Sequence, residues 1–138
     1  MAFDNSVFVD TSAFKAVLDE KDDFHLIATR VWADLLKKDT LLVTSNFIVD
    51  ETLTLIRIRC GLAKAKEFKE KIINSLKSLK IVRVMSIDER NAWHWFINEW
   101  KDLSFTDCVS FAVMERLGLE KVASFDQHFA KAGFKIVE

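Results

Sequence analysis

The segment VFVDTSAF, residues 7–14, joins a short apolar run to the start of a helical pattern, with an acid at the junction. Val7, Phe8 and Val9 are typical of a buried strand, and Asp10 stands where that strand ends. Asp10 has two interpretations. It caps the following helix, where a carboxylate is favoured, or it belongs to an active site. The choice between them depends on the rest of the chain.

Four further β-rich runs alternate with helical patterns. The runs lie at 41–43, 81–84, 121–124 and 134–137, and the helical patterns lie at about 12–20, 24–38, 46–60, 62–79, 88–100, 105–117 and 126–131. Continuously apolar strands separated by helices predict a parallel sheet covered on both faces. The functional crevice of such folds lies at the carboxyl ends of the strands, which is where Asp10 stands.

Composition limits the function further. The chain has 138 residues, half of them apolar, and a net charge of −1. We expect one domain over residues 1–138, in a cytoplasmic protein, because no apolar run is long enough for a membrane span and no signal peptide opens the chain. Near-neutral charge means that any nucleic-acid contact must be local. The three glycines each follow a predicted helix, which excludes a Walker P-loop or a dinucleotide fingerprint.

Glu51 is the second acid of interest because it is expected to point inward. Its helical neighbours include Phe47, Ile48 and Leu55, whereas Asp50 lies on a polar face. A buried carboxylate needs a proton, a basic partner or a metal. Since no lysine or arginine lies on that stripe within one turn, we expect a metal or a protonated acid.

Asp107 and Asp126 each have a structural interpretation as well. Asp107 lies three residues after Ser104 at capping-box spacing, and Asp126 opens a short helix. Two carboxylates about 4 Å apart repel each other by roughly 4 kcal/mol at an effective dielectric constant of 20, so their convergence adds no stability. Convergence is favoured around Mg²⁺ or Mn²⁺, which prefer oxygen ligands and serve phosphoryl chemistry.

Four segments together resemble the PIN domain family, in particular the VapC-type toxins of prokaryotic toxin–antitoxin pairs. They are VFVDTSAF (7–14), SNFIVDETLTLIR (45–57), LSFTDCVSFAVMERLG (103–118) and KVASFDQHFAKAGFKIV (121–137), and the resemblance covers essentially the whole chain. It implies a three-layer α/β/α fold with a five-stranded parallel sheet of order 3-2-1-4-5. It also implies a Mg²⁺- or Mn²⁺-dependent endoribonuclease in which metal-activated water attacks the phosphate and leaves 5′-phosphate and 3′-hydroxyl ends.

The resemblance assigns roles to residues by their match to the family's motifs. The catalytic residues and ligands of one or two metal ions are expected to be Asp10, Glu51, Asp107 and Asp126. The hydroxyl groups expected to orient these carboxylates are those of Thr11, Ser12, Thr106 and Ser124. The expected partners are RNA, a small antitoxin protein and a second copy of the chain in a homodimer, with no membrane.

Two other segments carry open interpretations. Residues 57–80 hold eight basic residues against two acids, which is consistent with a solvated helical face or with an RNA-binding arm. The candidate RNA contacts there are Arg57, Arg59, Lys64 and Lys66. In the stretch NAWHWFINEW (91–100), helical spacing predicts that Trp93, Phe96, Ile97 and Trp100 pack in the core and that Trp95 is exposed.

Other functions fit the sequence less well. A receiver-like signalling domain would need an acid closing its central strand, but the third predicted strand is followed by Met85 and Ser86. His25, His94 and His128 have no nucleophile at a recognisable spacing, so they are expected to be ordinary polar residues. Two alternatives to a toxin stay open: a PIN nuclease of ribosomal or transfer RNA processing, and a silent PIN module that binds RNA or a partner.

Overall fold

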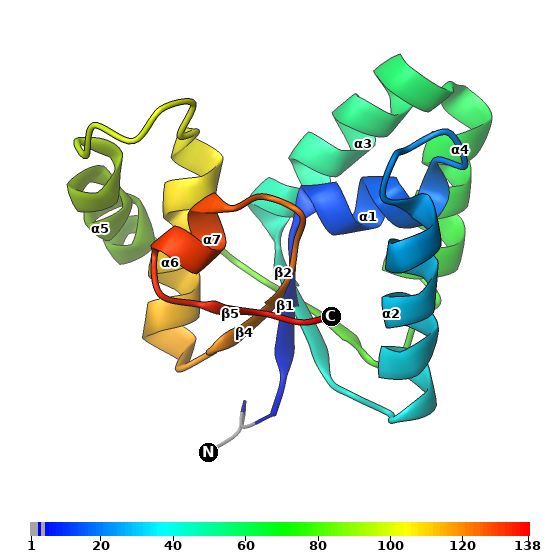
Figure 1. Ribbon diagram of the computed structural model, residues 1–138, viewed down its shortest axis with the longest axis horizontal. Coiled ribbons are helices and arrows are strands. Elements are labelled where there is room, and N and C mark those ends of the chain that lie inside the picture. The colour runs from blue at the N-terminus through cyan, green and yellow to red at the C-terminus, as the bar shows by residue number, and fades with distance from the viewer. Residues whose placement is uncertain (1–2, 4) are drawn as a thin grey trace.

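A five-stranded, all-parallel sheet lies between two layers of helices (Figure 1) in the computed structural model, which describes residue 3 and residues 5–138. The strands are β1 (Val7–Val9), β2 (Leu42–Ser45), β3 (Leu79–Val82), β4 (Lys121–Ala123) and β5 (Lys135–Ile136). The helices are α1 (Thr11–Leu18), α2 (His25–Lys37), α3 (Asn46–Cys60), α4 (Leu62–Glu67), α5 (Ser86–Phe96), α6 (Phe105–Leu117) and α7 (His128–Lys131). The order β3-β2-β1-β4-β5 confirms the predicted fold class.

The first strand lies at the centre of the sheet. Val7 pairs with Leu42 of β2 on one side and with Lys121 of β4 on the other. The chain fills the sheet outward from β1 in one direction and then in the other, so the order of strands reverses at β1. In an open parallel sheet the crevice beyond such a reversal is the usual ligand site. Asp10 directly follows β1 and stands at this point.

Each helical layer is fixed by large buried side chains. Helices α1–α4 cover one face of the sheet and α5–α7 the other (Figure 1). Phe14 of α1 meets Phe68 edge to face at 5.1 Å on the first side, and Phe111 of α6 meets Phe129 of α7 at 5.0 Å on the second. All four are fully buried. Such aromatic packing holds α1 and α6 in place on opposite faces of the sheet.

The predicted helix at 62–79 extends too far. Gly61, at φ 95°, separates α3 from α4, and α4 continues into a π-helical segment, Phe68–Ile73. The strand predicted at 81–84 begins two residues earlier, at Leu79, where the predicted helix was expected to end, and β3 pairs in register with β2 over its whole length. Local helical periodicity is therefore overridden by hydrogen bonding to a neighbouring strand, which no local pattern reports. No helix in the described part of the chain is long and apolar enough to cross a bilayer.

The prediction for the aromatic stretch was wrong about which face is buried. Trp93 and Ile97 are 56% and 60% exposed. Trp95 is half-buried, packs against Phe111 at 5.2 Å and donates its indole N–H to Glu115 Oε1 at 2.8 Å. The buried stripe of α5 runs through Asp88, Ala92 and Trp95, so it includes a small residue and an acid that a hydrophobicity pattern passes over.

Asp88 is a buried acid with a structural role. Its carboxylate is fully buried and takes two hydrogen bonds from Arg116 of α6, at 2.8 Å from Nε and 2.9 Å from Nη2. The same carboxylate accepts the backbone N–H of Met85 at 2.8 Å, ahead of the first turn of α5. The bidentate ion pair joins α5 to α6, and the bond from Met85 caps the N-terminus of α5.

We expect Asp88→Ala to lower the free energy of unfolding by about 2–3 kcal/mol, because it removes the buried carboxylate that pairs with Arg116 and accepts the backbone N–H of Met85. Urea unfolding followed by circular dichroism measures the change. Glu89→Ala, at the exposed neighbouring position, is the matched control. Equal stabilities for the two variants would contradict this role for Asp88.

Candidate active site

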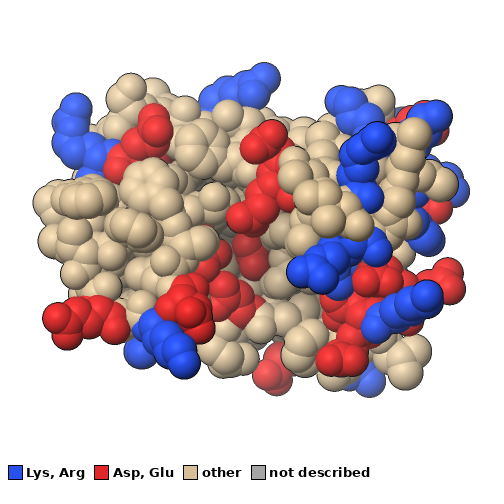
Figure 2. Space-filling view, turned by 90° about the horizontal axis from the view of Figure 1, so that it is seen from above, with Lys and Arg blue, Asp and Glu red and all other residues tan. Residues whose placement is uncertain are grey.

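A pocket of about 690 Å³ opens at the carboxyl ends of β1 and β4. It contains all four acids that were predicted from the sequence, and they come from four separate segments. Asp10 follows β1, Glu51 lies on α3, Asp107 lies in the first turn of α6, and Asp126 follows β4. Viewed from above, acidic side chains gather in a hollow at the centre of this face (Figure 2). The fold therefore brings the predicted quartet together.

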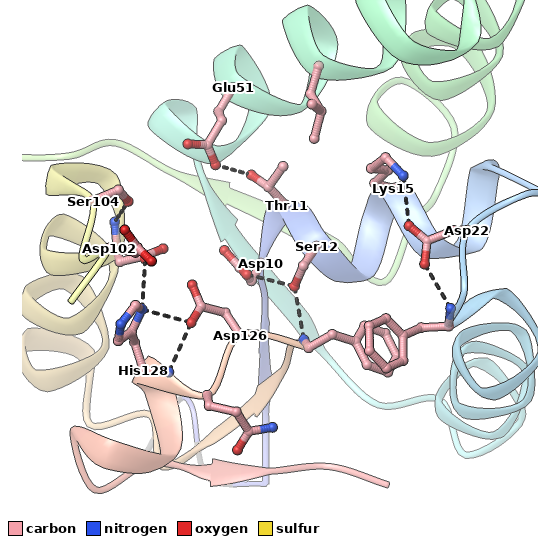
Figure 3. A pocket seen from close by; sticks show the side chains of 15 residues that line it. Asp10, Thr11, Ser12, Lys15, Asp22, Glu51, Asp102, Ser104, Asp126 and His128 are labelled. Atoms are coloured by element: carbon pink, nitrogen blue, oxygen red, sulfur yellow. Dashed lines mark hydrogen bonds and ion pairs between the residues drawn. The ribbon is translucent and has the colours of Figure 1, made fainter. Parts of the chain in front are cut away.

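Asp10 does not cap helix α1, although it occupies the N-cap position. Its side chain makes no capping hydrogen bond. Instead Asp10 Oδ2 accepts hydrogen bonds from Ser12 Oγ and Ser124 Oγ, both at 2.9 Å, and the side chain points into the pocket (Figure 3). The capping interpretation of Asp10 is therefore wrong, and the two serines hold its carboxyl group in one orientation.

Burial raises the pKa of Asp10 from 3.8 to about 6. The hydrogen bonds from Ser12 and Ser124 oppose this rise because they stabilise the carboxylate, and the charges of Glu51 and Asp126 add to it. Asp10 is 3% exposed, so little water is available to stabilise its negative charge. A cation beside Asp10 would remove this penalty.

Asp107 is perturbed in the same direction. Ser104 Oγ caps α6 by accepting the backbone N–H of Asp107 at 3.0 Å, which leaves the Asp107 carboxyl group free to face the pocket. Burial, the charge of Asp10 and a hydrogen bond to Asp126 together hold the pKa of Asp107 well above its usual range. Two neighbouring carboxyl groups with raised pKa values are typical of a functional site.

Asp126 is positioned by its own loop. Its backbone N–H donates to Ser124 Oγ at 3.0 Å, and its Oδ1 accepts the backbone N–H of His128 at 2.9 Å. Ser124 Oγ therefore links Asp126 to Asp10, because it accepts the backbone N–H of Asp126 and donates to the carboxylate of Asp10.

Glu51 faces the pocket from the opposite wall. It is half-buried, as predicted, while Asp50 is exposed. Thr11 Oγ1 donates to Glu51 Oε1 at 2.5 Å, and Thr52 Oγ1 donates to Thr11 Oγ1 at 3.2 Å. These two hydrogen bonds hold the Glu51 carboxylate in position at the pocket.

Three of the four hydroxyl residues predicted to orient the carboxylates contact them directly: Thr11, Ser12 and Ser124. Ser12 also accepts the backbone N–H of Phe125 at 2.9 Å, which ties the first and fourth loops together. Thr106 is half-buried in α6 and is not among the described residues that line the pocket. Ser104, at the N-cap, positions Asp107 instead.

The four basic residues predicted to bind RNA lie outside the pocket. Arg57, Arg59 and Lys66 are exposed, and Lys64 is half-buried with its Nζ 3.7 Å from Glu67 Oε2. Their contact with RNA stays a prediction. Lys15 does line the pocket, but its Nζ lies 3.0 Å from Asp19 Oδ2 and 2.7 Å from Asp22 Oδ2, so its charge is already neutralised.

His128 is a site residue that sequence reasoning missed. It lines the pocket beside Asp107 and Asp126, and one ring nitrogen and two carboxylate oxygens lie within 4.8 Å of one another. The sequence feature that could have identified it is its position two residues after Asp126, because a tight loop can place two such side chains on the same side.

The donor set of this pocket fits a divalent cation. Six acids line it, namely Asp10, Asp22, Glu51, Asp102, Asp107 and Asp126. Among the described lining residues, Lys15 is the one lysine or arginine, and Asp19 and Asp22 hold it. A phosphate group cannot approach so many carboxylates unless a cation lies between them. Hard cations such as Mg²⁺ and Mn²⁺ prefer these oxygen ligands.

The fold and this acidic pocket define a PIN domain. Residues 7–135 match the model of that family, and the chain belongs to it. The chain is 35% identical over 132 residues to proteins called 23S rRNA-specific endonuclease VapC20 from two strains of Mycobacterium tuberculosis, CDC 1551 / Oshkosh and ATCC 25618 / H37Rv. The match covers 93% of this chain and 95% of theirs.

Solved structures agree with this placement. The crystal structure of Mycobacterium tuberculosis VapC20, described as a sarcin–ricin loop cleaving toxin, superposes with a TM-score of 0.83 at 35% identity, covering 94% of this chain and 96% of that one. FitAcB from Neisseria gonorrhoeae, at 18% identity and 96% coverage of both chains, has a TM-score of 0.65 and shares the fold. The matches confirm the predicted family and support the predicted enzyme class, a nuclease.

We expect Asp10→Asn to stabilise the metal-free protein at neutral pH. The folded-state pKa of Asp10 lies above 3.8, so in wild type the stability contributed by its protonated form is present below pH 4 and is lost as the pH rises to about 6. At pH 7.5 in EDTA, the variant should exceed wild type by about 2–3 kcal/mol in free energy of unfolding.

Urea unfolding at pH 4 and pH 7.5 measures this difference, with Asp50→Asn on the exposed side of α3 as the control. Parallel pH profiles for wild type and Asp10→Asn would show that the Asp10 carboxyl group is not strained by its surroundings.

Proposed function

We propose that the protein is a divalent-metal-dependent endoribonuclease that acts as the toxin of a toxin–antitoxin pair. The observation that carries this is the convergence of Asp10, Glu51, Asp107 and Asp126 in one pocket, where Asp10 and Asp107 are buried and have raised pKa values. Such an arrangement costs folding free energy, so it is explained by the cation it binds and not by stability.

The proposed ligands of the cation are Asp107, Asp126 and Asp10, with Glu51 on the facing wall. A bound Mg²⁺ or Mn²⁺ lowers the pKa of a water nucleophile and offsets the negative charge that develops on the phosphodiester. Ser12 and Ser124 hold Asp10 Oδ2 in a fixed orientation, so Oδ1 would be the oxygen of Asp10 that is free to bind the cation. Glu51, held by Thr11, is the carboxylate available to accept a proton from the attacking water.

The proposed substrate class is a structured loop of large-subunit ribosomal RNA. VapC20, at 35% identity over nearly the whole chain, is called a 23S rRNA-specific endonuclease and a sarcin–ricin loop cleaving toxin. The pocket wall here includes Phe24 and Phe125, stacked at 4.6 Å, and Phe24 is 45% exposed. An exposed aromatic face beside a phosphodiester site suits an unpaired base that has left its stack.

We expect the purified protein to cleave a sarcin–ricin loop oligonucleotide in Mg²⁺ or Mn²⁺ and to leave it intact in EDTA. Glu51→Gln should reduce the cleavage rate by at least about 10²-fold, because it removes the proposed proton acceptor. Asp50→Asn, one residue away and exposed, should cleave at the wild-type rate. The readout is single-turnover cleavage on a denaturing gel.

Cleavage in EDTA at the full rate, or a fully active Glu51→Gln variant, would overturn the proposed chemistry. Cleavage of transfer RNA with no cleavage of the ribosomal loop would assign the protein to RNA processing or to another toxin target. Growth arrest on expression, relieved by co-expression of a small protein from a neighbouring gene, tests the toxin role and the proposed antitoxin partner.

The basic segment at 57–80 is proposed to hold RNA outside the pocket. Lysine and arginine side chains stand around the rim of the face seen in Figure 2, most of them on the half that carries α1–α4. We expect the double variant Arg57→Ala/Arg59→Ala to raise the KM for RNA several-fold with little change in kcat and to weaken its dependence on salt. Lys37→Ala/Lys38→Ala, exposed at the end of α2, is the charge-matched control. An unchanged KM in the first variant would favour the solvated-face interpretation.

A further inference from the structure

His128 divides its two ring nitrogens between a backbone carbonyl and the acidic pocket. Nε2 lies 2.8 Å from the carbonyl oxygen of Lys101. A carbonyl oxygen can only accept, so Nε2 carries the hydrogen of this bond. The ring is also stacked on Trp100, parallel to within 3° at 6.4 Å, and the side chain is 17% exposed. The orientation of the imidazole is therefore fixed from two directions.

The other nitrogen, Nδ1, faces carboxylate oxygens. It lies 2.9 Å from Asp126 Oδ1 and 3.7 Å from Asp107 Oδ2, as the convergence of Asp126 and His128 in Figure 3 illustrates. Nδ1 is buried and has no hydrogen-bond partner, so the short contact with Asp126 lacks the alignment of a hydrogen bond. In the neutral ring with hydrogen on Nε2, the Nδ1 lone pair points at two oxygen atoms that are also electron-rich.

The side chains of His128, Asp107 and Asp126 are 17%, 10% and 29% exposed, and a cation between the three electron-rich atoms would offset their mutual repulsion. Ligand atoms about 2.1 Å from a metal are about 3.0 Å apart when adjacent and about 4.2 Å apart when opposite. The distance of 2.9 Å from Nδ1 to Asp126 Oδ1 is close to the value for adjacent ligands, and the 3.7 Å to Asp107 Oδ2 lies between the two values. A histidine that binds a metal through one nitrogen and donates the other N–H to a backbone carbonyl is the usual arrangement in metal sites.

We propose that His128 is a nitrogen ligand of the metal held by Asp107 and Asp126, and that it biases this position toward Mn²⁺ over Mg²⁺. The inference rests on the proposed metal-dependent function. Mg²⁺ takes oxygen ligands almost exclusively and gains little from an imidazole, whereas affinity for nitrogen donors rises along the first transition series. A site with only oxygen ligands distinguishes Mn²⁺ from Mg²⁺ weakly. One imidazole ligand among the carboxylates therefore raises the affinity for Mn²⁺ relative to that for Mg²⁺.

Pulsed electron paramagnetic resonance of the Mn²⁺-loaded full chain tests the bond itself. We expect the spectrum to contain a ¹⁴N coupling from one directly bound imidazole. Protein labelled with ¹⁵N-histidine should convert this coupling to that of ¹⁵N, which needs no sequence change. Absence of any histidine nitrogen coupling on bound Mn²⁺ would overturn the proposal.

Competition between the two ions tests the selectivity. We expect His128→Gln to lose the nitrogen coupling and to weaken Mn²⁺ binding about tenfold, with Mg²⁺ binding changed less than about threefold. His94→Gln, exposed on α5, should match wild type. An equal loss of both ions would mean that His128 only positions the carboxylates, which would overturn the ligand assignment.

The outcomes also separate this inference from the function it rests on. Mn²⁺ bound to wild type without a histidine coupling contradicts the role of His128 alone and leaves the metal-dependent nuclease standing. Folded wild-type protein that binds neither Mn²⁺ nor Mg²⁺ would overturn the metal site and this inference with it. Circular dichroism would test whether His128→Gln is folded, and the ¹⁵N-labelled wild type decides the question if it is not.

Discussion

Mutual repulsion among carboxylates that share one pocket, two of them buried, is the constraint on which this site depends. Asp10 and Asp107 are buried, and burial raises the pKa of each because the charged form has lost its water. The surrounding serine and threonine hydroxyls orient the carboxylates and do not neutralise them. The folded protein therefore holds a site that is unfavourable when empty of positive charge, which is a property of a metal centre or a catalytic dyad and not of a structural core.

The strands and helices that carry the four acids hold them in place. Asp10 follows the central strand β1, and its neighbours arrive on α3, on α6 and after β4. The Phe14–Phe68 contact packs α1 against the π-helical segment, and the Phe111–Phe129 contact packs α6 against α7, so each helical layer has its own aromatic contact. Asp88 provides a useful contrast. It is buried more completely than any of the pocket acids, yet it has Arg116 as a direct partner and belongs to the structure.

The charge distribution fits the way such a protein would meet RNA. The pocket is acidic and the chain is near neutral overall, so long-range attraction must come from basic residues outside the pocket. The proposed cation at the acids would then provide the local attraction for one phosphate. On the proposal made above, the segment at 57–80 would supply RNA affinity at a place separate from the chemistry of Asp10 and Glu51, since its basic residues lie outside the pocket.

The amino-acid pattern alone was sufficient for the alternating strands and helices, the parallel sheet and the inward-facing Glu51, because these depend on periodicity and on the residue at the end of a strand. The strand order and the acidic quartet came from the resemblance to PIN domains. Other features depended on the folded chain: the failure of Asp10 to cap α1, the exposure of Trp93, the start of β3 at Leu79, and the place of His128 beside Asp126. A local pattern records which residue types share a face. The direction of a side chain, and the partner it meets, depend on segments more than a hundred residues away, as the bond between Ser124 and Asp10 illustrates.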